Sequence, residues 1–314
     1  MIQFIRVILV LAALAVVSAC VSITIEEPNR EGSGLRQSDF SAPKGYTRFL
    51  SDAPHAYRRG LVSVGDPVRR GVSSERFELR DGDCGGSDCG APRSRAEIQM
   101  DQTLSKAKVG QDVWYGWSFF NASVPSFTKQ NSLRLVFGQW TLGGKQKPIF
   151  RLIQLGKGEG DFSKCPPTGC AGPSYGKGDV VVQLEDVARY QGWNAAQNNG
   201  YICRLFDMQA QTGKWVDLTV NTNFSTGADG YLRVWVNRRL VCNYRGPVVS
   251  ALSANGEIKH RRGVFSSWHK RWRDTMKGEP RPTLVVYYDE FRTGASQAEV
   301  DPQFLSKAGV EAVD

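Results

Sequence analysis

The chain carries a recurring pattern of short apolar segments. Hydrophobic and polar residues alternate in residues 76–80 (RFELR) and 95–100 (RAEIQM), whereas residues 113–120 (VWYGWSFF) form a continuous apolar and aromatic run. Alternation predicts strands with one buried face, and a short continuous run between turn residues predicts a strand buried on both faces. Further segments of strand composition follow at 132–140, 147–155, 180–185, 215–224, 230–244 and 284–294.

Clusters of Gly, Pro, Asn and Asp separate these segments, and Asn237-Arg238 divides residues 230–244 into a predicted hairpin. Helical periodicity is weak and is confined to residues 183–191 and 297–312. Many short strands at regular spacing predict an all-β fold, a jelly roll of the concanavalin or lectin type with few short helices. Because no change of composition marks a second domain, we expect one domain over 46–296 and a C-terminal tail over 297–314.

The N-terminus has the pattern of a targeting segment. Arg6 precedes an apolar run over residues 7–17 that ends in small residues directly before Cys20. This is typical of a bacterial lipoprotein signal peptide, residues 1–19, removed before an acylated cysteine. An ordinary secretory signal cleaved after Ala19 is the alternative.

The polar residues 20–45 then predict a flexible tether between the acylated Cys20 and the domain. Val21 and Ser22 lack the Asp that retains lipoproteins at the inner membrane. We therefore expect an exported lipoprotein of the cell envelope, anchored by lipid at the outer membrane and facing the periplasm or the cell surface.

The chain has seven cysteines, and lipidation of Cys20 leaves an even number. In an oxidising compartment they predict disulfides, two of them closing tight local loops. Zinc is the competing interpretation, but only three histidines accompany the cysteines, and we expect no metal. The predicted pairs are Cys84–Cys89, Cys165–Cys170 and Cys203–Cys242.

The net charge of +9 favours an acidic partner. A uronic-acid polysaccharide and lipid headgroups are both compatible with export. Nucleic acid is not expected, because the chain has no recognisable binding module. We expect a monomer that binds an acidic polysaccharide.

Six segments, in order, resemble the heparin lyase I and glucuronan lyase type of polysaccharide lyase, which has a concanavalin-like jelly roll. Residues 76–98 contain a stapled loop followed by an Arg-x-Glu strand. FGQW (137–140) is similar to the family's Gln-x-His strand, and KHRRGVF (259–265) to its Lys-x-Gly-x-Tyr strand. The other matching segments are VWYGWSFF (113–120), the hairpin 229–241 and the closing strand 285–294.

The resemblance implies β-elimination on a uronate glycan, which requires neutralisation of the sugar carboxylate, a base for the C5 proton and an acid for the leaving oxygen. Gln139 matches the neutralising Gln, Arg95 and Glu97 match the Arg-x-Glu strand, and Arg261 aligns with the strand Lys. The structural alternatives are a solvent-facing or hydrogen-bonded Gln139 and a simple Arg95–Glu97 salt bridge. Period-two geometry predicts that both residues of that pair share one sheet face.

Two departures put cleavage in doubt. Thr141 occupies the position of the family's catalytic His, and Phe265 occupies that of its catalytic Tyr. The register can be different, the protein can bind sugar without cutting it, or another residue can transfer protons. His260 is the first substitute because it lies in the matched strand. The others are His269, Tyr115, Tyr287 and Tyr288.

Further candidates surround these positions. Lys259, Arg262 and Arg233 are expected to add positive charge to a groove, and Trp140 and Trp268 to stack on sugar rings. The acidic loop 81–88 suits Ca²⁺ in principle, but we favour a disulfide-held turn with Asp caps and expect no cofactor. The sequence thus favours a lyase, with a non-catalytic glycan-binding lipoprotein as the alternative. A third reading is an envelope protein that grips an acidic surface polymer.

Overall fold

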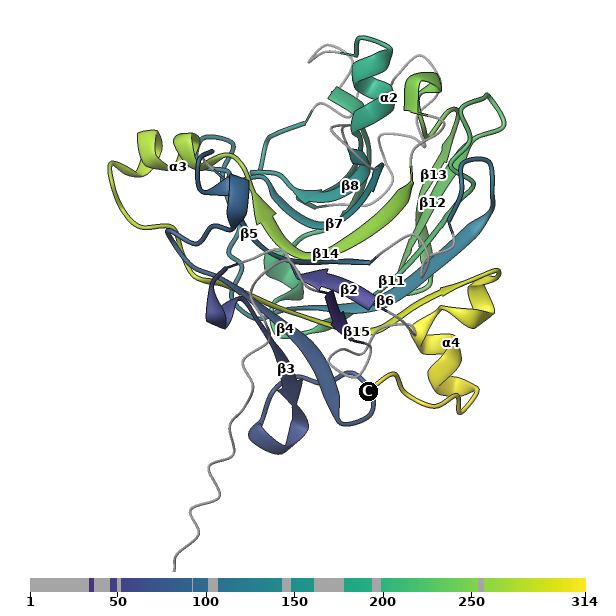
Figure 1. Cartoon of the computed structure of the whole chain (residues 1–314), viewed down its shortest axis with the longest axis horizontal. Coiled ribbons are helices and arrows are strands. Elements are labelled where there is room, and N and C mark those ends of the chain that lie inside the picture. The colour runs from purple at the N-terminus through teal and green to yellow at the C-terminus, as the bar shows by residue number, and fades with distance from the viewer. Residues whose placement is uncertain are drawn as a thin grey trace, which may run out of the picture.

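The protein folds into two antiparallel β-sheets packed face to face (Figure 1). This confirms the predicted all-β jelly-roll sandwich. The computed structural model describes residues 34–36, 46–49, 52–91, 93–100, 107–142, 148–160, 178–193, 199–253 and 257–314.

Eight strands form the first sheet, in the order β1 (Gly34–Arg36), β2 (Tyr46–Phe49), β5 (Ser94–Met100), β14 (Ile258–Ser266), β7 (Leu135–Leu142), β8 (Pro148–Gln154), β9 (Val180–Leu184) and β10 (Tyr201–Phe206). Seven form the second, in the order β13 (Arg239–Arg245), β12 (Tyr231–Val236), β11 (Trp215–Thr222), β6 (Val113–Asn121), β15 (Leu284–Gly294), β4 (Ser73–Leu79) and β3 (Tyr57–Leu61).

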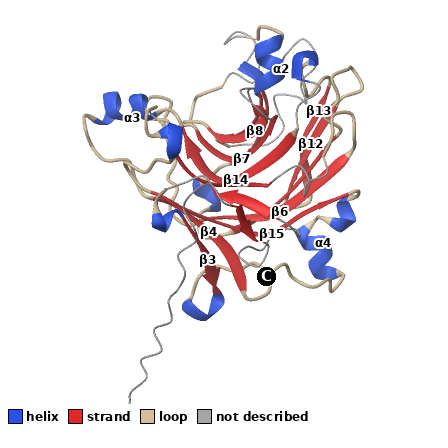
Figure 2. Ribbon diagram, viewed as in Figure 1, coloured by secondary structure: helices blue, strands red, loops and turns tan. Residues whose placement is uncertain are grey.

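The helices of the described residues are short and lie outside the two sheets (Figure 2). They are α2 (Glu185–Tyr190), α3 (His269–Met276) and α4 (Pro302–Lys307). In the part of the chain that the structure describes, none of them has the length and apolar character that crossing a membrane requires. Single 3₁₀ turns occur at Pro54–Ala56, Val62–Val64, Gly86–Asp88, Gln209–Gln211, Ala251–Ser253 and Gln297–Glu299.

Each segment with a strand pattern contains a strand, and α2 forms within the predicted helix 183–191. The Asn237-Arg238 turn joins β12 to β13, with φ values of 48° and 67° at its two residues. β1 lies inside the stretch expected to be tether. It pairs with β2 through backbone hydrogen bonds, which require no hydrophobic pattern.

The core between the sheets contains a cluster of packed aromatic side chains. Trp117 and Phe119 from β6 pack against Trp140 and Phe137 from β7, and all four are buried. One ion pair crosses this core, in which the Arg262 guanidinium donates two hydrogen bonds to the Glu75 carboxylate at 2.6 and 2.7 Å. Because both partners are buried, removing either one would leave an uncompensated charge.

The disulfides Cys84–Cys89 and Cys203–Cys242 are confirmed. The second joins β10, at the edge of the eight-stranded sheet, to β13, at the edge of the other sheet. It therefore closes one side of the sandwich. Cys165, Cys170 and the predicted lipidation site Cys20 lie outside the described residues.

Candidate functional site: an arginine-lined groove

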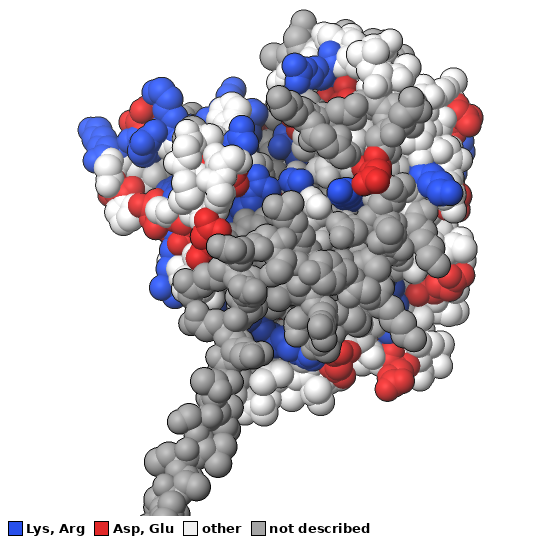
Figure 3. Space-filling model, viewed as in Figure 1, with Lys and Arg blue, Asp and Glu red and all other residues white. Residues whose placement is uncertain are grey.

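A groove of about 960 Å³ lies on the concave face of the eight-stranded sheet. This face is flanked by α2 and α3 (Figure 1). Its lining residues come from six adjacent strands, β5, β14, β7, β8, β9 and β10, and from α2. Basic side chains gather in the hollow (Figure 3). Among the described lining residues, Glu185 is the one acid, against six arginines: Arg93, Arg95, Arg134, Arg151, Arg189 and Arg261.

The strand register brings the predicted residues together. Arg261 on β14 is directly opposite Gln139 on β7, which in turn is opposite Arg151 on β8. All three line the groove. Gln139 and Arg261, which match the family's Gln and Lys positions, are therefore neighbours in the sheet.

Glu97 connects Gln139 to Arg95. The Gln139 amide Nε2 donates to Glu97 Oε1 at 2.6 Å, and Arg95 Nη1 donates to Glu97 Oε2 at 3.3 Å. Glu97 is fully buried, and burial raises the pKa of its carboxyl, while the charges of Arg95 and Arg261 act in the opposite direction. The predicted Arg95–Glu97 pair exists, and Ala96 and Ile98 face the core as expected. Glu97 holds two groove side chains rather than facing a ligand itself.

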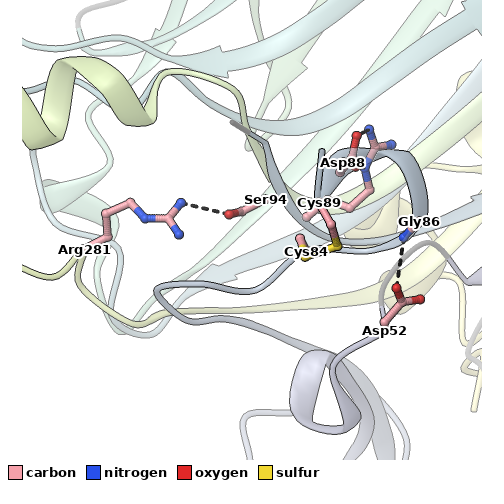
Figure 4. The surroundings of a disulfide bond; sticks show 8 residues. Asp52, Cys84, Gly86, Asp88, Cys89, Ser94 and Arg281 are labelled. Carbon is pink, nitrogen blue, oxygen red and sulfur yellow. Dashed lines mark hydrogen bonds and ion pairs between the residues drawn. A yellow bond between two sulfur atoms is a disulfide. The ribbon is translucent and has the colours of Figure 1, made fainter. Parts of the chain in front are cut away.

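The stapled loop supplies a second partner for Arg95. Asp88, directly before Cys89, is buried and accepts two hydrogen bonds from the Arg95 guanidinium. Figure 4 shows how the Cys84–Cys89 bond closes this loop, whose Gly86 N–H donates to Asp52 at 2.9 Å. The disulfide thus fixes the carboxylate that orients a groove arginine.

The loop aspartates have basic or backbone partners. Asp81 accepts from Arg281, Asp83 accepts from the Arg80 backbone N–H at 2.7 Å and lies 2.8 Å from His55 Nε2, and Asp88 binds Arg95. No group of three potential metal ligands occurs among the described residues. These pairings are those of the disulfide-held turn that the sequence favoured.

Thr141 and Phe265 lie where the alignment places them. Thr141, on β7 two residues after Gln139, is buried, and its hydroxyl has no hydrogen-bond partner. Phe265 lines the groove, with the Arg95 guanidinium 4.7 Å from its ring centre. Gly263 is required just before it, because at φ 125° a Cβ would lie 2.1 Å from the Ala96 carbonyl oxygen.

Three predicted groove residues point the other way, and their assignment is corrected. His260 and Arg262 flank Arg261 on β14, so the period-two alternation turns both into the core. Trp140 follows Gln139 and is fully buried against Phe150. The His260 ring stacks on Phe291 at 4.7 Å, and neither of its nitrogens has a partner. Burial and the nearby Arg262 lower the pKa of His260 well below 6.5.

Of the remaining predicted binding residues, one lines the groove and two do not. Trp268 lines the groove, but the guanidinium groups of Arg134 and Arg271 lie 3.7 and 4.0 Å from its ring, and both arginines bind Glu159. Lys259 is opposite Thr141 and pairs with Glu257 at 3.4 Å rather than lining the groove. Arg233 belongs to the second sheet, on β12.

Tyr201 is the one tyrosine among the described lining residues, and no sequence pattern selects it. It starts β10 and packs in a small apolar strip on the groove floor. Burial raises the pKa of its phenol, whereas Arg134 lowers it. Tyr115, Tyr287, Tyr288 and His269, the other substitutes considered, are not among the lining residues. The strip comprises Val136, Ile153, Leu155, Val181, Tyr201 and Phe265.

Sequence reasoning also missed Arg151 and Gln183. Both interrupt otherwise apolar runs, in KPIFRLIQL and VVVQLE, at positions that face the groove. A polar residue inside an apolar strand was the available signal. Without knowledge of the strand order, such a polar residue cannot be distinguished from one that faces solvent on an edge strand.

No curated protein matches the chain. Among solved structures, the endo-β-1,4-glucuronan lyase from the fungus Trichoderma reesei is similar at 16% identity and a TM-score of 0.48, covering 78% of this chain and 89% of that one. The family 7 alginate lyase A1-II′ is similar at 11% identity and a TM-score of 0.46, covering 84% of this chain and 100% of that one. The alginate lyase from Klebsiella pneumoniae is similar at 10% identity and a TM-score of 0.44, covering 71% of this chain and 82% of that one.

The polysaccharide lyase family model matches residues 53–292, which include every strand from β3 to β14 and most of β15. The match includes Arg95, Gln139 and Arg261 and the positions held by Thr141 and Phe265. The chain belongs to the polysaccharide lyase family.

Proposed function

We propose that the groove binds a uronic-acid-containing polysaccharide. The observation that carries this proposal is the charge of the lining, six arginines against the single carboxylate of Glu185 among the described residues. Guanidinium groups bind carboxylates through paired charge-assisted hydrogen bonds. Three of these arginines also pair with carboxylates of the protein: Arg95 with Asp88, Arg134 with Glu159 and Arg151 with Glu185.

Gln139, Arg95 and Arg261 are the proposed carboxylate-binding residues. Each is held in place by a neighbour: Gln139 by Glu97 at 2.6 Å, Arg95 by Asp88, and Arg261 by the Gln99 amide oxygen at 2.8 Å. Side chains fixed before the ligand arrives lose little conformational freedom on binding. Phe265 and Tyr201 of the apolar strip line the groove beside them.

Cleavage by β-elimination is the second candidate, and Tyr201 is the observation that favours it. Elimination removes the proton on C5, forms the C4–C5 double bond and breaks the bond from C4 to the leaving oxygen, which takes up a proton. A tyrosine with a raised pKa remains protonated near neutral pH and can supply that last proton. The family's catalytic His and Tyr positions hold Thr141 and Phe265, so no base is assigned for the C5 proton, and binding ranks ahead of cutting.

One experiment separates the two candidates. The purified domain is incubated with glucuronan, alginate and heparin, while binding is measured by calorimetry and the unsaturated product by its ultraviolet absorbance. Binding without product supports the first candidate. Product that is lost in Tyr201→Phe but retained in Tyr287→Phe, a tyrosine outside the groove, supports the second. Absence of both binding and product for every acidic glycan contradicts the proposal.

A further inference from the structure

The polar residues along the centre of the groove alternate between glutamine and arginine on five adjacent strands. The strand pairing aligns Gln99 with Arg261, Arg261 with Gln139, Gln139 with Arg151, and Arg151 with Gln183. We call these five residues the Gln/Arg row. Arg261, Gln139, Arg151 and Gln183 of the row line the groove.

Both arginines of the row are oriented by an outer glutamine. Arg261 Nε donates to Gln99 Oε1, and Arg151 Nη2 donates to Gln183 Oε1, each at 2.8 Å. An amide oxygen fixes the plane of a guanidinium without neutralising its charge. Arg151 also pairs with Glu185 of α2 at 2.7 Å, at the groove wall. The central Gln139 donates to Glu97 and to neither arginine.

The spacing of the two arginines is set by the sheet. Gln139 separates them, so Arg261 and Arg151 lie two strands apart, about 10 Å at the usual strand separation. Because the lining residues come from six adjacent strands, a polymer that follows the groove crosses the strands. Each sugar of an extended 1,4-linked chain advances by a distance close to one strand spacing. Two arginines two strands apart therefore face sugars that are two positions apart.

We propose that Arg261 and Arg151 bind two carboxylates of one glycan chain, carried on the same side by every second sugar. The inference rests on the proposed function and specifies its ligand. Two kinds of polymer present this chemistry. One is a homopolyuronate whose successive rings alternate in orientation, and the other is a copolymer in which a uronate alternates with an uncharged sugar.

A length series of glucuronan oligosaccharides tests the spacing, because a trisaccharide is the shortest with carboxylates two sugars apart. Calorimetric affinity should rise roughly tenfold from disaccharide to trisaccharide, the contribution of one charged hydrogen-bonded contact. Arg151→Gln should abolish this rise, so that the trisaccharide binds no more tightly than the disaccharide. Arg189→Gln is the matched control, since it removes the same charge from the groove wall on α2 outside the row, and it should preserve the rise.

Gln183→Ala provides a second variant that keeps the charge of Arg151 but removes its orienting amide, and it should reduce the rise. An unsulfated tetrasaccharide that alternates uronate with N-acetylhexosamine, compared with the glucuronan tetrasaccharide, identifies the polymer by the larger effect of Arg151→Gln. An unchanged rise in Arg151→Gln, or an equal loss for disaccharide and trisaccharide, overturns the inference while the binding proposal stands. Failure of every acidic oligosaccharide to bind overturns the binding proposal itself.

Discussion

At the scale of single residues, strand alternation decides which candidates can reach a ligand. On β14, Arg261 faces the groove while its two neighbours, His260 and Arg262, face the core. The resemblance to the family identified the strand correctly. It did not identify which neighbours share the face of Arg261, and His260 is the residue for which this matters most.

His260→Phe tests this placement through the pH dependence of stability. The folded protein keeps His260 neutral because its pKa is lowered well below 6.5, whereas the unfolded chain takes up a proton below its ordinary value. Stability is therefore lost as pH falls through and below about 6.5. The variant lacks this titration, and its phenyl ring needs no hydrogen-bond partner where the imidazole has none.

Urea unfolding at about pH 7.5 and about pH 5 should give a smaller loss of unfolding free energy in His260→Phe than in the natural protein. Glycan binding should be unchanged, because His260 does not line the groove. A variant that loses binding while keeping its fold would place His260 in the functional site and contradict the structure.

At the scale of elements, the two disulfides differ in what they connect. Cys84–Cys89 closes a loop whose residues are five apart and fixes Asp88 beside Arg95. Cys203–Cys242 links edge strands of the two sheets across 39 residues. In the chain-entropy model these separations correspond to about 2 and about 4 kcal/mol of stabilisation.

Paired alanine variants separate the two roles. Cys203→Ala with Cys242→Ala should lower the unfolding free energy by roughly twice as much as Cys84→Ala with Cys89→Ala. The Cys84/Cys89 variant should instead show the larger loss of glycan affinity, because Asp88 is then less firmly held against Arg95. Denaturant unfolding and calorimetry measure the two effects. Equal effects of both variants on both quantities would contradict the assignment.

The strands show how far the sequence could be interpreted. β4 and β5 were predictable because one face is buried and the other polar, and β6 because it is apolar throughout. β14 reads as a basic segment, and only the resemblance marked it as a strand. Its Arg262 is buried through the ion pair with Glu75, a partner 187 residues away that no local pattern could indicate. Arg151 and Tyr201 could not be identified from the sequence either, because their place in the groove depends on the strand order.

At the scale of the whole molecule, the net charge of +9 has a structural counterpart in the groove. The arginines of the groove lie on β5, β8, β14 and α2 and, for Arg93 and Arg134, directly before β5 and β7, so they meet only in the fold. The predicted lipid anchor at Cys20 would tether this groove to a membrane, which we propose as its location. A tethered domain can engage a polymer near the envelope without diffusing away.

Cys20→Ser tests the anchor in cells. Removing the acylated thiol should move the protein from the membrane fraction to the soluble fraction of the envelope and abolish incorporation of labelled fatty acid. Ser18→Thr, a change in the signal that leaves Cys20 in place, is the control and should remain in the membrane fraction. Fatty-acid labelling that persists in Cys20→Ser would contradict the prediction.

The central claim is that the groove recognises the carboxylates of a polysaccharide. The most direct measurement is calorimetric titration of the domain with one uronate oligosaccharide and with the same oligosaccharide after reduction of its carboxyl groups to neutral alcohols. The account predicts binding of the acidic form that weakens as salt is raised and is lost in Gln139→Ala with Arg261→Gln, and no measurable binding of the reduced form. Equal binding of the two forms, or binding that survives both substitutions, would contradict it.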